Sequence, residues 1–233
     1  MQRKVSTDVT PRRGFLHRIG AVALGVSLPW SRARGATRAP QAGPDDWLDT
    51  LTGTHRCYFS PRAFGTGVPL IRIHNYIRTY REDYGVDGGE INAVVEIGGA
   101  RLDGNLPLAF NDRMWEKYAL GEPRELIDPA TGAPTVRNMF YRPQPNDPVL
   151  IAPTGMQILE AGMESLQAKG ATFLLCNNAL KAFTQIMADS GKGTTEEIGR
   201  DLRANILPGI VIVPAVIIAA EKAQQAGLAY QRL

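Results

Sequence analysis

ATFLLCNNALKAFTQIMA, residues 171–188, is the stretch from which the fold of this chain can be predicted. Residues 171–176 form a mostly apolar run that follows Gly170, which is typical of a strand buried in a sheet. Residues 177–188 then predict a helix. A strand that leads directly into a helix is typical of an α/β protein whose strands run parallel.

Strands and helices alternate along the rest of the chain as well. Further strands are predicted at residues 54–59, 91–97 and 209–213. Further helices are predicted at about residues 65–84, 112–120, 154–170, 194–205 and 214–227. Because parallel strands are joined by right-handed crossovers, we expect a three-layer α/β/α sandwich with a mainly parallel sheet of about five strands. Residues 105–148 are rich in proline and are predicted as an insertion that holds only the short helix at 112–120.

The side-chain pattern assigns faces to these elements. In the first strand, His55, Cys57 and Phe59 share one face, and Arg56 and Tyr58 share the other. Two helices show an apolar stripe that should face the core. The members of the stripes are Leu70, Ile73, Ile77, Tyr80 and Tyr84 in the first helix, and Met156, Leu159, Met163 and Leu166 in the helix that Thr154 should cap.

The first residues of the chain contain an export motif. Arg12 and Arg13, followed by Phe15 and Leu16, resemble the consensus of the twin-arginine signal and precede an uncharged run over residues 19–28. That run is about half of the roughly 20 residues needed to span a bilayer. We therefore expect a signal segment over residues 1–36, a linker and lead-in over 37–53, and a domain over 54–233. A disordered basic arm or an amphipathic membrane-surface helix is the alternative.

Export would place the protein in the periplasm, with the membrane contacted only transiently through the signal segment. Residues 1–36 hold seven of the 26 lysines and arginines and one of the 23 aspartates and glutamates. The remainder therefore has 19 basic and 22 acidic residues, a formal net charge of −3. Because the basic excess belongs to the signal segment, nucleic acid is not an expected partner.

Two cysteines, Cys57 and Cys176, are too few for a disulfide scaffold and lack the spacing of a C-x-x-C motif. A bridge between them would close a loop of about 120 residues, and an oxidising compartment would permit it. Proteins exported through the twin-arginine route fold in the reducing cytoplasm, so the fold is not expected to require this bond. The alternative is that both thiols stay free.

Three stretches in the last third of the chain form a consistent pattern: GATFLLCNNALK at residues 170–181, LPGIVIVP at 207–214 and AQQAGLAY at 223–230. They resemble the DsrE-like family of sulfur-relay proteins. Members of that family commonly show a strand that ends in Cys-Asn, a strand that ends in Val-Pro, and a helix that leads to Gly-x-x-Tyr. The segment FNDRMWEKY, residues 110–118, is similar to an insertion carried by an exported subgroup of the same family.

The resemblance implies sulfur transfer, in which a cysteine at a strand end accepts or passes a sulfane sulfur as a persulfide. Only Cys176 matches that thiol. The resemblance also implies a homo-oligomer and a sulfane-sulfur donor or acceptor protein as partner. The alternative is a non-catalytic ligand-binding or protein-interaction module on the same scaffold, with residues 105–148 as its recognition surface.

The position of Cys176 suits a nucleophile. A thiol just before a helix is close to the positive end of the helix dipole, which favours the thiolate. Asn177 or Asn178 could cap that helix, and Lys181 could add positive charge one turn further on. The alternative is that Cys176 packs as a small buried hydrophobe.

The other candidate binding residues are His55 and Arg56 on the first strand, and Arg113 and Trp115 on the short helix of the insertion. Each has a structural alternative, since a strand histidine or a helix tryptophan often belongs to the core. The sequence contains no Walker loop, no G-x-G-x-x-G, no H-E-x-x-H and no G-x-S-x-G motif. We therefore expect no cofactor and no metal site.

Overall fold

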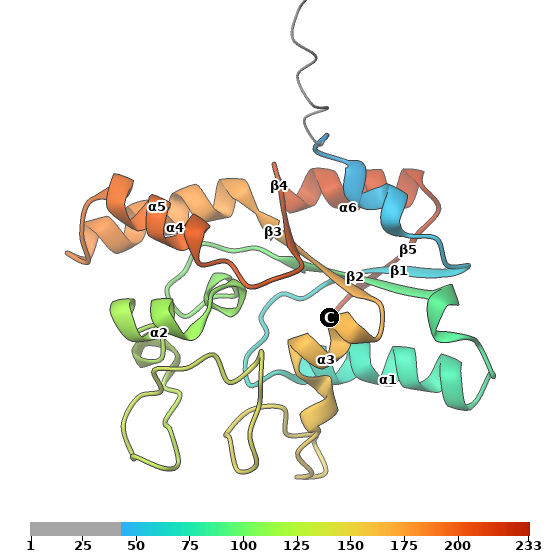
Figure 1. The fold of residues 1–233 in the computed structure, drawn as a ribbon, viewed down its shortest axis with the longest axis horizontal. Helices are drawn as coiled ribbons and strands as arrows, with labels where there is room; N and C mark the ends of the chain where they lie inside the picture. The colour runs from blue at the N-terminus through green and yellow to red at the C-terminus, as the bar shows by residue number, and fades with distance from the viewer. Residues whose placement is uncertain (1–42) are drawn as a thin grey trace, which may run out of the picture. The chain divides into compact units, whose positions relative to one another are not determined.

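The computed structural model describes residues 43–233, which form one compact unit. Its centre is a sheet of five parallel strands in the order β4-β3-β2-β1-β5 (Figure 1). The strands are β1 (His55–Ser60), β2 (Ile91–Ile97), β3 (Ala171–Cys176), β4 (Ile210–Val213) and β5 (Ala229–Arg232). The predicted fold class, a mainly parallel α/β sandwich, is confirmed.

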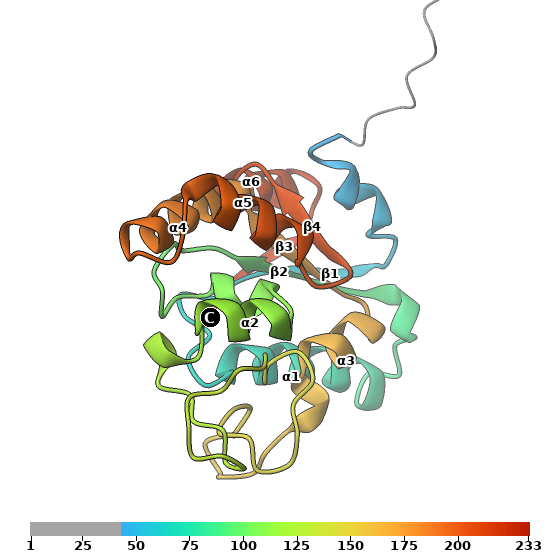
Figure 2. The same ribbon diagram turned by 60° about the vertical axis from the view of Figure 1, so that its left-hand side comes forward.

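Six α-helices cover this sheet within the described residues. They are α1 (Val68–Glu82), α2 (Asp112–Tyr118), α3 (Met163–Ala168), α4 (Asn177–Asp189), α5 (Thr195–Ala204) and α6 (Val216–Gln225). Figures 1 and 2 both show α6 above the sheet and α1 and α3 below it, whereas the buried side chains of α4 and α5 join the same larger core as those of α1. No helix among residues 43–233 is long and apolar enough to cross a membrane.

The two faces of the sheet bury different cores. Alternate strand residues such as Cys57, Phe59 and Phe173 belong to the larger core, which includes side chains of α1, α3 and the insertion. Tyr58, Val94 and Leu174 belong to the smaller core, which includes α6. The prediction that Cys57 and Phe59 share one face of β1 and Tyr58 the other is therefore confirmed.

Some boundaries differ from the prediction. The stretch 154–170 is not one helix: it holds a 3-10 turn (Leu159–Ala161) and the short α3, and Met156 is 62% exposed. Gly162 is extended, with φ −60° and ψ 146°, and separates the two pieces. The stripe of α1 also ends early, because the helix stops at Glu82 and Tyr84 is exposed.

The strands at the two edges of the sheet also differ from the prediction. Residues 209–213 were expected to form a buried final strand, whereas β4 is an edge strand with Val211 and Ile212 exposed. The last strand is β5, which pairs with β1 at the opposite edge. Its four residues are all exposed, so their sequence lacks the apolar alternation that identifies a strand.

Two residues that precede β1 belong to the packed domain. The 3-10 turn Asp46–Thr50 precedes β1, and Trp47 and Leu51 are buried in the core on the α6 face. The packed domain thus begins before residue 54, inside the stretch predicted as a lead-in. The predicted export residues Arg12, Arg13, Phe15 and Leu16 lie outside the described residues.

Candidate functional site

Cys176 lies at the carboxyl end of β3, where it occupies the N-cap position of α4. Its Sγ accepts a hydrogen bond from the backbone N–H of Ala179 at 3.4 Å. Both cysteines are buried, Cys176 with 7% and Cys57 with 1% of the surface exposed. The thiol is therefore placed at the positive end of a 13-residue helix, the position at which a negative charge on sulfur is stabilised.

The two asparagines after Cys176 have roles other than the predicted cap. Cys176 itself caps α4, while Asn177 accepts a 2.6 Å hydrogen bond at Oδ1 from Arg203 of α5. The backbone N–H of Asn178 donates to the carbonyl of Pro214, which ties the start of α4 to the end of β4. Lys181 is exposed on α4. Arg203 is thus a cation held at the start of α4 that the sequence did not predict.

Gly98 and Val216 lie next to Cys176. A Cβ built on Gly98 would be 3.2 Å from Cγ2 of Val216 and 4.0 Å from Cβ of Cys176. Gly98 follows β2, and Val216 is the first residue of α6. The thiol therefore lies at the junction of three segments at the carboxyl edge of the sheet, where ligands of open parallel α/β sheets bind.

A carboxylate and two hydroxyls share this edge of the sheet. The hydroxyl of Tyr58 lies 2.9 Å from Oε2 of Glu96, to which it donates, and 3.0 Å from the carbonyl of Val216. The hydroxyl of Ser60 donates to Oε1 of Glu96 at 2.6 Å. Both oxygens of the carboxylate are thus satisfied by hydroxyl groups. We call Tyr58, Ser60 and Glu96 the Glu96 cluster.

Tyr58 is held in its protonated form within the Glu96 cluster. Burial raises the pKa of Tyr58 well above its usual range, and the negative charge of Glu96 and the hydrogen bond to it raise it further. Tyr58 therefore remains a protonated donor at any physiological pH.

His55 and Arg56 lie at the other end of the sheet. They open β1, whereas Cys176 closes β3, so roughly 20 Å of strand separates the two positions. The ring of His55 packs 4.4 Å from the ring of Tyr80, and Arg56 donates to the carbonyl of Ala226 at 3.0 Å. The structure therefore does not bring these two residues to the cysteine.

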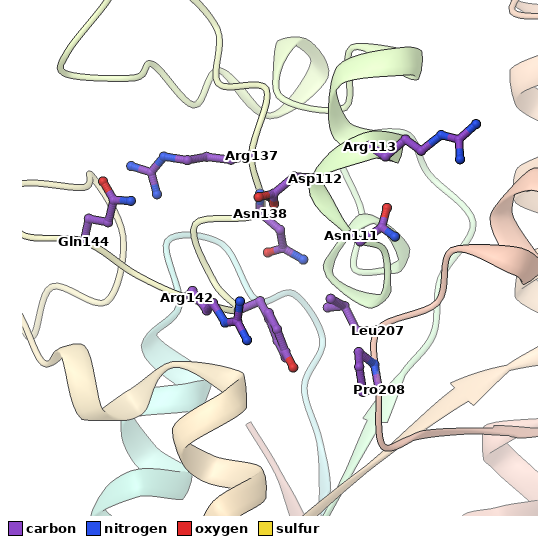
Figure 3. Close-up of a pocket in the computed structure, with 10 residues that line it drawn as sticks. Asn111, Asp112, Arg113, Arg137, Asn138, Arg142, Gln144, Leu207 and Pro208 are labelled. Carbon is purple, nitrogen blue, oxygen red and sulfur yellow. The ribbon is translucent and has the colours of Figure 1, made fainter.

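The two candidate residues of the insertion, Arg113 and Trp115, lie in different surroundings. Trp115 is fully buried, and its Nε1 donates to the carbonyl of Pro107 at 3.0 Å, which places it in the core. Arg113 is exposed and lines a cavity of about 450 Å³ between the insertion and the loop before β4. Figure 3 shows Asn111, Asp112 and Asn138 grouped in this cavity, with the side chain of Arg113 extending away from Asn138.

Reasoning from the sequence did not identify Glu96, Tyr58, Ser60 or Arg203 as part of the site. One signal was present: Glu96 is the only charged residue in the strand INAVVEI, whose other positions suit a covered sheet. An acidic residue inside such a run requires a polar partner. The partners themselves depend on which strands are neighbours.

Comparisons with protein-family models, with curated proteins and with solved structures found no match for this chain. Among residues 43–233, no group of three or more histidine, cysteine, aspartate or glutamate side chains is arranged to hold a metal ion. The candidate site is therefore defined by its own geometry, with Cys176 as its candidate nucleophile.

The two thiols are expected to differ in reactivity. Both cysteines are free, and they project from opposite faces of the sheet, Cys57 into the larger core. Burial raises the pKa of Cys57 to about 11, so this thiol stays protonated and shielded at pH 8. Iodoacetamide at pH 8 should label the folded protein once, at Cys176, and twice after denaturation. Peptide mapping would identify the site, and native labelling of Cys57 would contradict its burial.

Proposed function

We propose that this protein is a sulfur-transfer protein in which Cys176 carries sulfane sulfur as a persulfide. The observation that carries the proposal is the placement of the thiol at the N-cap of α4, with Sγ accepting the N–H of Ala179. The resemblance of residues 170–181, 207–214 and 223–230 to DsrE-like proteins supports the same chemistry. The proposal includes export to the periplasm and assembly into a homo-oligomer.

The reaction needs no external oxidant. The thiolate of Cys176 attacks the outer sulfur of a donor persulfide, so that a new S–S bond forms at Cys176 while the S–S bond of the donor breaks. The inner sulfur of the donor leaves with the electron pair of the broken bond and takes up the proton that Cys176 has lost. The donor thus becomes a thiol, and Cys176 becomes a persulfide. The N–H of Ala179 stabilises the thiolate before attack.

Intact-mass analysis after incubation with polysulfide tests this function. The wild-type protein should gain the mass of one or more sulfur atoms, and dithiothreitol should remove it. Cys176→Ser should abolish the gain completely, because the serine hydroxyl is not a sulfur nucleophile at neutral pH. Cys57→Ala is the matched control and should retain full uptake. Equal uptake by the wild type and Cys176→Ser, or none by either, would exclude Cys176 as the carrier.

A ligand-binding module is the alternative function, and one observation favours it. The Oδ1 atom of Asn111, which lines the cavity of Figure 3, is buried and accepts no hydrogen bond from any described residue. A buried acceptor without a donor costs free energy that a ligand N–H or O–H would recover. A Cys176 that takes up no sulfur would leave this alternative in place.

A further inference from the structure

Glu96 is a carboxylate at the carboxyl edge of the sheet, on the face that carries the smaller core. It extends from β2 on the same side as Tyr58, Val94 and Leu174, all of which are fully buried in the core covered by α6. Hydrogen bonds from Tyr58 at 2.9 Å and Ser60 at 2.6 Å are its polar contacts among the described residues. Glu96 is half-buried and has no cationic partner among the described residues, so its charge can act on a neighbouring group.

The register of the sheet brings Glu96 next to Cys176. Glu96 pairs with Leu174 of β3, and Cys176 is two residues further along β3, on the same face. With strands about 4.8 Å apart and a rise of about 3.3 Å per residue, the two Cα atoms are about 8 Å apart. Tyr58 links the two positions through Val216: its hydroxyl lies within hydrogen-bond distance of Glu96 and of the carbonyl of Val216, and Val216 and Cys176 both lie beside Gly98.

The other charged or titratable groups around this face do not neutralise Glu96. No ion pair to Glu96 forms within residues 43–233. On the elements packed against this face, these groups are Tyr58 on β1, Tyr230 and Arg232 on β5, Cys176 on β3, Glu221 and Lys222 on α6, Arg56 at the start of β1, and Asp46 and Asp49 in the 3-10 turn before β1. The first turn of α6, which contacts the cluster through Val216, carries no charge.

We propose that Glu96 regulates Cys176, because its negative charge disfavours the thiolate and holds the resting site as a thiol. This inference rests on the proposed function of Cys176. Opposing influences then act on the sulfur: the N–H of Ala179, the dipole of α4 and the cation Arg203 at the start of α4 favour the thiolate, and Glu96 opposes it. A partner that neutralises Glu96 on docking would release the nucleophile. Glu96 is thus a positioning residue that acts through charge.

The rate of iodoacetamide alkylation at Cys176, measured from pH 5 to 10, tests this regulation. Glu96→Gln should move the midpoint of the profile to lower pH and accelerate alkylation near neutral pH by about tenfold, which corresponds to about one pH unit. The amide preserves the shape and can still bond both hydroxyls. Glu96→Leu, which suits the apolar face, should shift the profile in the same direction and serves as the second charge-free variant.

Two controls separate charge from structure. Tyr58→Phe removes a hydrogen bond and keeps the carboxylate, so its midpoint should not fall below that of the wild type. Glu196→Gln removes an equal charge from a side chain of α5 that is 89% exposed, and should leave the profile unchanged. In guanidinium chloride all variants should react alike, because the sheet that holds Glu96 near Cys176 is lost.

The outcomes distinguish this inference from the function on which it rests. Unchanged or upward-shifted profiles for Glu96→Gln and Glu96→Leu would overturn the regulation by Glu96, whatever the sulfur uptake. A downward shift in a protein that takes up no sulfur from polysulfide would support the charge coupling and reject sulfur transfer. A downward shift in Tyr58→Phe equal to that of Glu96→Gln would assign the effect to the hydrogen-bond network and overturn the role of the charge.

Discussion

Trp115→Ala is expected to lower the free energy of unfolding by about 3 to 5 kcal/mol, the range typical of a buried tryptophan. The indole is fully buried among side chains of the larger core, and its Nε1 donates to the carbonyl of Pro107 at 3.0 Å. The variant would leave a large cavity and an unpaired carbonyl. Thermal unfolding followed by circular dichroism should show a fall in Tm of roughly 10 °C for a domain of this size.

Arg113→Ala is the matched control on the same helix. Arg113 is exposed and forms no ion pair with any described residue, so this change should alter the free energy of unfolding by less than about 0.5 kcal/mol. Trp115→Phe should lie between the two variants, because it keeps most of the ring volume and loses the hydrogen bond. A Trp115→Ala protein as stable as the wild type would contradict the burial of the indole.

The contrast between Trp115 and Arg113 shows the limit of a local pattern. Both residue types occur in binding surfaces and in helices packed on a core, so their order along the chain does not decide between the two. The choice depends on the side of α2 that faces the 3-10 turn Leu106–Ala109, whose Pro107 accepts the indole N–H. That contact is set by tertiary packing.

The central strands were predictable because they are apolar and alternate with helices. Residues 91–97 and 171–176 coincide with β2 and β3, which lie inside the sheet and need no polar face. The edge strand β5 could not be predicted in this way. Its residues are exposed, so only its pairing with β1 identifies it as a strand. The prediction of one helix over residues 154–170 was wrong, because the apolar residues keep a helical spacing on both sides of Gly162, whose backbone is extended.

The candidate site was half predictable for a related reason. The position of Cys176 between strand and helix follows from one continuous stretch of sequence. Glu96, Tyr58 and Ser60 come from two other strands, and their proximity to Cys176 depends on strand order and register. Arg56 shares the face of Tyr58 and His55 lies on the opposite face, and both residues are at the other end of the strand from Cys176. A single sequence contains no direct information about such pairings.

Asp147→Ala is expected to lower the free energy of unfolding by about 2 to 4 kcal/mol. The Asp147 side chain is fully buried and forms a bidentate ion pair with Arg137, one bond being 3.0 Å from Nη1 to Oδ2. Its Oδ2 also accepts the backbone N–H of Gln144 at 2.7 Å. Removing one partner of such a pair leaves a charge without compensation, at a cost of about 3 to 5 kcal/mol when both are buried. Arg137 is 20% exposed and lies 3.7 Å from Asp128, which reduces the expected cost.

The double variant Arg137→Met with Asp147→Leu separates the loss of the pair from the exposure of one charge. Because apolar replacement of both partners removes the desolvation penalty together with the attraction, the double variant should be closer in stability to the wild type than Asp147→Ala is. Urea unfolding gives the free energies, and hydrogen exchange should show faster opening of residues 128–147 in Asp147→Ala. If the double variant is destabilised by the sum of the losses measured for Arg137→Met alone and Asp147→Leu alone, the two side chains are not energetically coupled. The insertion would then be held by its apolar contacts, chiefly Met139 and Phe140, which are fully buried in the larger core.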